Sequence, residues 1–124
     1  MNNTLMVDTL GKLLGYHTRI KELHWTVVPN LGLHKQIDEF DSDLLEFTDE
    51  IAEDAQCMFG LVVPGEINPI LPEETDFGSL LRGIRILLAG LKDQMTDKCW
   101  TGIVNCIDEF WHIVNKNLYL NGTN

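Results

Sequence analysis

The sequence predicts an all-α domain, a four-helix bundle in which one long connection joins the second and third helices. Three observations support this prediction. Apolar residues recur every three or four positions over four long runs, glycine and proline interrupt the chain between the runs, and no stretch of useful length alternates in the way a strand does. A chain of 124 residues can bury one core, so residues 1–124 are expected to form a single domain.

The positions of these runs give the expected helices. The first is expected over about 3–27 and the second over about 31–60. The third is expected over about 77–94, with Thr75 or Asp76 as its N-cap, and the fourth over about 97–120, with Thr96 as its N-cap. The positions that define the faces of the first two helices are Leu10, Leu13, His17, Ile20, His24 and Val27, and Ile37, Phe40, Leu44, Phe47, Ile51 and Met58.

The lengths of the connections constrain the topology. Short turns join the first helix to the second and the third to the fourth, so each pair is expected to form an antiparallel hairpin. The middle connection, LVVPGEINPILPEET, holds three of the four prolines and cannot be helical throughout. Its residues can extend roughly 50 Å, and the second helix is roughly 42 Å long. The second and third helices can therefore be parallel, which is the ferritin-like arrangement, although an unstructured loop of this length gives the same pattern.

The charge of the chain excludes some partners. The formal net charge is −10 and the pI is about 4.6, which argues against binding to nucleic acid or to an anionic membrane. The start MNNTLMVDTL lacks the features of a signal peptide, and no run approaches 18 apolar residues. Cys57, Cys99 and Cys106 have no metal-binding spacing, and we interpret them as buried thiols in a reducing compartment. We therefore expect a cytoplasmic protein.

The second helix carries many acidic residues, and their angular positions separate them into two groups. With His34 as the origin and about 100° per residue, Asp38 lies at about 40°, Asp49 at about 60° and Glu53 at about 100°. These four residues share one face, away from the apolar stripe at about 220–300°. A second group lies at about 120–180° and is interpreted as a solvated edge: Glu39, Asp43, Glu46 and Glu50.

The first group predicts a metal site shared by two chains. The pair His34 and Asp38 and the pair Asp49 and Glu53 lie roughly 20 Å apart along one helix, so one ion cannot touch both pairs. An antiparallel second copy, related by a two-fold axis between Asp43 and Leu44, brings unlike pairs together and creates two identical sites. His24, near the end of the first helix, can add a ligand beside His34. Two imidazoles and three carboxylates suit Fe(II), with Zn or Mn as alternatives.

These residues resemble the signature of the Dps-type mini-ferritins. LHW at 23–25, followed by His34, Asp38, Asp49 and Glu53 at spacings of four, eleven and four, is similar to the family's ferroxidase motif. The resemblance implies a dodecameric ferritin-like protein that oxidises and stores iron. It further implies that His24, His34 and Asp38 come from one chain and that the last two acids come from the two-fold-related chain.

The chain departs from the family pattern in three ways. The interval from His24 to His34 is ten residues, about two fewer than usual. The middle connection is shorter, which predicts that the small helix it normally contains is missing. The lysine-rich tail with which some members bind DNA is absent from the sequence, so DNA binding is not expected.

Several other residues have two interpretations. His17 is a core or interface histidine, or else an auxiliary metal contact. Trp25 is a large packing residue, or an electron donor as the resemblance suggests. Glu109 and His112 have the Glu-x-x-His spacing of di-iron bundles but lack the matching partners, so we interpret them as surface and packing residues. The remaining aromatic residues are expected in the core or at an interface: Trp100, Trp111 and Tyr119.

The expected function is therefore that of a ferroxidase and iron-storage mini-ferritin that protects against oxidative stress. Its substrates would be Fe(II) and peroxide or oxygen, and its product Fe(III) would be sequestered. It would be a homo-oligomer built on two-fold dimers, with a dodecamer expected. The alternative is a catalytically silent ferritin-like module that uses the same face for assembly only.

Overall fold

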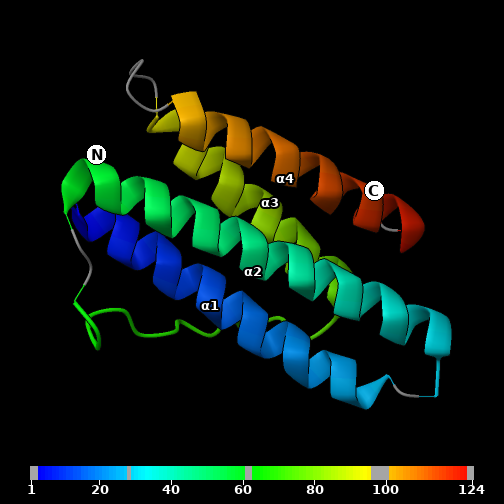
Figure 1. Ribbon diagram of the computed structural model, residues 1–124. Coiled ribbons are helices and arrows are strands. Elements are labelled where there is room, and N and C mark those ends of the chain that lie inside the picture. Colours follow the sequence, from blue (N-terminus) through cyan, green and yellow to red (C-terminus); the bar gives the residue numbers. More distant parts are fainter. Residues whose placement is uncertain (1–2, 28, 61–62, 96–100, 123–124) are drawn as a thin grey trace.

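The computed structural model describes residues 3–27, 29–60, 63–95 and 101–122. They form four helices: α1 (Asn3–Thr26), α2 (Leu31–Phe59), α3 (Phe77–Asp93) and α4 (Thr101–Leu120) (Figure 1). No strand occurs within these ranges. The predicted all-α four-helix bundle is confirmed.

The helix ends differ from the expected ends by small amounts. Asp76, and not Thr75, caps α3, and its side chain accepts a hydrogen bond from the Ser79 N–H. The same bond stabilises the ionised carboxyl and lowers the pKa of Asp76 below its ordinary value. The expected N-cap Thr96 and the expected start of the fourth helix at 97 lie outside the described residues.

The core forms where the apolar faces of the four helices meet. Five of the six stripe positions predicted for α2 are buried, and the side chain of the sixth, Met58, lies outside the described set. Phe40 and Phe47 of α2 stack on Phe110 of α4 at centroid distances of 5.7 and 4.4 Å. Both α1 and α4 pack against α2 and against α3. The core therefore fixes the antiparallel α1–α2 hairpin that carries the predicted ligands.

The connection between α2 and α3 lies along α1. The Ile70 N–H donates to the Gly11 carbonyl oxygen at 2.9 Å, and the Arg19 guanidinium donates to the Pro72 carbonyl oxygen. In Figure 1, the connection runs back along α1, and α3 then runs in the same direction as α2. Residues 63–76 contain no helix. This segment is thus a long crossover that packs on α1. Its length was sufficient for such a path, because the extended connection can reach further than the second helix is long.

One expectation about side chains outside the candidate site needs correction, that Cys106 is a buried thiol. The prediction of core or interface positions for the aromatic residues is not contradicted: Trp111 packs against the core from its edge, and Tyr119, 71% exposed, keeps the interface alternative. Cys106 is partly buried, and burial, followed by its contact with Glu50, raises the pKa of its thiol to about 11. Trp100, Cys99 and the side chain of Cys57 lie outside the described residues.

Candidate metal centre

The turn between α1 and α2 brings two histidines into contact. The side chain of Asn30 accepts a hydrogen bond from the Leu33 N–H and caps α2, so the new helix starts directly after a short turn. His24 in the last turn of α1 then stacks on His34 in the first turn of α2, with ring centroids 3.9 Å apart. The sequence predicted this proximity from the shortness of the turn.

Hydrogen bonding orients the His34 ring. Its Nδ1 lies 3.1 Å from the backbone carbonyl oxygen of His24. Because a carbonyl oxygen can only accept, this bond places the proton on Nδ1 and leaves the Nε2 lone pair available. A ring nitrogen that donates to a backbone carbonyl is the usual companion of a metal-binding nitrogen on the same ring.

The other imidazole has an unsatisfied nitrogen. Nδ1 of His24 is buried and, among the described residues, has no hydrogen-bond partner. Its nearest acidic group is Asp38, whose Oδ1 lies 3.9 Å away, while that carboxylate is 62% exposed. Leaving a buried polar atom unpaired costs about 1–3 kcal/mol, which a metal ion between the imidazole and the carboxylate would offset. The His24 imidazole and the Asp38 carboxylate are donors of the kinds that the predicted cation site requires.

Asp49 and Glu53 do not join this cluster within one chain. Both are exposed and lie more than two turns further along α2, on the helix face that also carries His34 and Asp38. Within the described residues of a single chain, no group of three or more His, Cys, Asp or Glu side chains is arranged to hold a metal ion. One chain thus presents two imidazoles and a nearby carboxylate at one end of α2, and two carboxylates at the other.

Trp25 follows His24 but is not packed in the core. Its side chain is 63% exposed, so the interpretation as a packing residue of this chain is wrong. The other interpretation, electron donation, stays a prediction.

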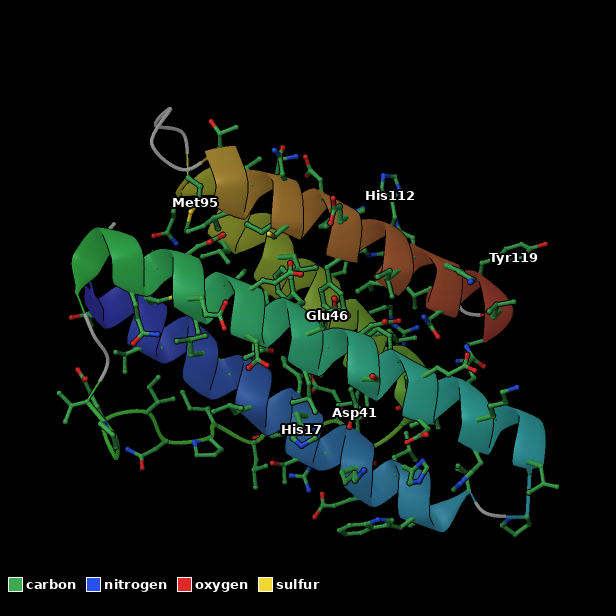
Figure 2. The ribbon with its side chains drawn as sticks, in the orientation of Figure 1. His17, Asp41, Glu46, Met95, His112 and Tyr119 are labelled. Atoms are coloured by element: carbon green, nitrogen blue, oxygen red, sulfur yellow. The ribbon has the colours of Figure 1, made fainter. Side chains whose placement is uncertain are left out.

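A buried pair that the sequence analysis missed links α1 and α2 midway along the hairpin. Nδ1 of His17 lies 2.7 Å from Oδ1 of Asp41, and the Asp41 side chain is only 7% exposed (Figure 2). Asp41 falls at about 340° on the helical wheel, between the apolar stripe and the ligand face, so the angular analysis could have separated it from the solvated acids. The pair explains His17 as a partly buried structural histidine that contacts Asp41 through its Nδ1.

Loss of His17 is expected to destabilise the fold. In His17→Ala the Asp41 carboxylate stays buried without its partner, which should lower the free energy of unfolding by about 1–3 kcal/mol. Adding Asp41→Asn to this variant should recover part of the loss, since a neutral amide costs less to bury than a carboxylate. Urea unfolding of the wild type and both variants measures this. Equal stability of wild type and His17→Ala would contradict it.

The second acidic group lines the side of α2 that faces α4. Glu39, Glu46 and Glu50 are exposed and Asp43 is partly buried, in agreement with the interpretation as a solvated edge. Asp43, Glu46 and Glu50 border a shallow groove of about 110 Å³ between the two helices. Glu109 and His112 of α4 are also exposed, as expected for surface residues.

Comparison with protein-family models, with curated proteins and with solved structures gives no match. Among the described residues, no helix combines the length and the apolar character that a membrane span requires. The case for a function therefore rests on the residues of α1 and α2.

Proposed function

We propose that the chain is a ferroxidase of the Dps-type mini-ferritin class, with each metal site shared between two copies of the chain. The observation that carries the proposal is the stacked His24–His34 pair beside Asp38, which is half of a ligand set. The complementary half, Asp49 and Glu53, is exposed on the same face of the same helix. The two halves lie symmetrically about the point between Asp43 and Leu44, so an antiparallel copy completes both.

The chemistry follows from the ligand types. Imidazole nitrogens and carboxylate oxygens bind Fe(II), and the carboxylates favour the more highly charged Fe(III) that oxidation creates. Each Fe(II) gives up one electron. One peroxide molecule takes two electrons and two protons and becomes two waters, so two Fe(II) balance one peroxide. The protein supplies the positions and charges, and the redox change belongs to the iron substrate.

The arrangement of the helices supports the same class. A crossover seated along α1, followed by an α3 that runs parallel to α2, is the topology of ferritin-like bundles (Figure 1). In this proposal two-fold dimers assemble further, with a dodecamer as the expected shell and Fe(III) stored inside it. The competing candidate is a catalytically silent ferritin-like module that uses the same face for assembly only.

An iron-oxidation assay separates the two candidates. Anaerobic addition of Fe(II) followed by peroxide should give a rapid near-ultraviolet ferric signal with the wild type. We expect Asp49→Asn/Glu53→Gln to lose at least about tenfold of this rate, because each shared site loses both carboxylates of one chain. Glu46→Gln/Glu50→Gln is the matched control: it removes the same charge from two exposed glutamates one turn apart, and it should keep the wild-type rate. A wild-type rate no faster than buffer would favour the silent module.

A further inference from the structure

A pocket of about 300 Å³ opens between α1, the crossover and the middle of α3. This volume is at the lower end of the range for small-molecule sites. The pocket shares no residue with the candidate metal centre. Its apolar lining comes from two segments of the chain, the crossover and α3: Ile70, Leu71, Pro72, Ile86 and Leu87.

Three of these apolar side chains are left exposed to solvent. Ile86 is 74% exposed, Leu71 50% and Ile70 45%. Single exposed apolar residues are normal on a protein surface, but these three border the same pocket. An apolar molecule bound there would remove their surface from water, which is favourable in proportion to the area covered. The lining therefore suits a ligand with an apolar body.

Tyr16 of α1 supplies a polar group within this lining. Its ring packs against the edge of the core, and its hydroxyl lies over Gly83 of α3 so closely that a Cβ added at position 83 would collide with it. Both residues line the pocket. The Tyr16 hydroxyl has no hydrogen-bond partner among the residues that the structure describes. It is therefore available to a ligand as a hydrogen-bonding group.

The charged residues of the pocket favour a cation. Glu74 lines it and is exposed, whereas Lys12, which also lines it, lies 3.0 Å from Asp8 and is neutralised by that carboxylate. Burial, followed by the charge of Glu74, raises the pKa of the Tyr16 hydroxyl, so the field of this carboxylate reaches the phenol. Carboxylate and hydroxyl oxygens both accept hydrogen bonds, and together they match the donors of an ammonium group.

We propose that this pocket binds a small primary amine with an apolar body. The ammonium group donates to the Glu74 carboxylate and the Tyr16 hydroxyl, and the apolar body covers Ile70, Leu71 and Ile86. Binding of this kind is independent of the proposed iron oxidation, because the two sites have no residue in common. A probe of only a few non-hydrogen atoms should bind with roughly millimolar affinity.

A ¹H–¹⁵N NMR titration of the full chain tests the proposal with hexylamine as the probe. The titration is made at about pH 7, where the amine is protonated, and at constant ionic strength. We expect saturable shifts at the amides of Leu71 and Gly83. Hexanol, which has the same apolar body without the charge, should bind at least about threefold more weakly, and hexanoate more weakly still. Methylamine, which lacks the apolar body, should give no saturable shift.

Three variants locate the two contacts of the ammonium group. Glu74→Gln should remove the preference for hexylamine over hexanol. Glu73→Gln is the matched control, because it removes the same charge from an exposed neighbour that does not line the pocket, and it should keep the preference. Tyr16→Phe keeps the aromatic wall but removes the hydroxyl, and it should weaken hexylamine binding at least about threefold.

The outcomes either support or overturn amine binding at this site. Shifts that do not saturate, or that saturate only outside the pocket, overturn it. Hexanol or hexanoate bound as tightly as hexylamine would show that the pocket does not select a cation. An equal loss of preference in Glu74→Gln and Glu73→Gln would attribute the effect to overall charge and also overturn the proposal. Loss in Glu74→Gln alone supports it.

Discussion

Gly15→Ala is expected to destabilise the protein, although alanine is the better helix former. A Cβ at position 15 would collide with the backbone carbonyl of Ile70, and one at position 11 would lie 2.6 Å from the Asn68 carbonyl oxygen. The backbone of the crossover cannot rotate away as a side chain can. It must leave α1, which breaks the hydrogen bond from Ile70 to Gly11 and the hydrogen bonds from Arg19 to Pro72.

The loss of stability from the collision and the broken hydrogen bonds exceeds the gain in helix propensity. Replacing glycine by alanine inside a helix gains about 1 kcal/mol from propensity. The collision costs about 1–3 kcal/mol, and each lost hydrogen bond adds about 1 kcal/mol. We expect a net loss of about 3–5 kcal/mol in the free energy of unfolding.

Gly90→Ala is the matched control for this prediction. Gly90 lies in α3, and a Cβ added to it would meet no atom within 4 Å, so alanine there should stabilise by up to about 1 kcal/mol. Urea unfolding of the two variants should therefore give shifts of opposite sign. A Gly15→Ala protein that is at least as stable as the wild type would show that the crossover does not depend on contact with α1.

The sequence was sufficient to predict the helices but not the path of the crossover. Periodic apolar positions specify α2 because burial of Phe40 and Leu44 requires one continuous face. The crossover can lie against α1 only because residues 11 and 15 are glycines. Considered by propensity alone, these glycines are merely weak helix formers. Their spacing of four residues marks a strip of α1 without side chains, a signal that has meaning only once a neighbouring backbone is known to lie there.

The sequence also predicted only part of the candidate site. The contact between His24 and His34 follows from a short turn between two antiparallel helices. Asp41 was missed because it is one of nine carboxylates on α2, and only its position at the edge of the apolar stripe distinguishes it. The exposure of Trp25 could not be predicted, because a tryptophan at the end of a helix can fold back on the core or point outward.

The proposal of a shared site depends on the spacing of the ligand residues along α2. Its most direct test therefore combines substitutions at opposite ends of that helix. His34→Ala alone and Asp49→Ala/Glu53→Ala alone should each be nearly inactive in iron oxidation, since both sites of every homodimer lose ligands. In a mixed dimer, one site collects all the lesions. The other takes His34 and Asp38 from the acid-variant chain and Asp49 and Glu53 from the histidine-variant chain, and is intact.

The measurement is the rate of ferric formation by purified heterodimers, made by co-expressing the two variants with different affinity tags. Recovery of up to about half of the wild-type rate per dimer is the predicted result, because one of two sites is restored. The two homodimers, mixed only after purification and assayed before exchange, serve as the control. Heterodimers as inactive as the homodimers would contradict the shared site and place the ligands within one chain or outside metal chemistry.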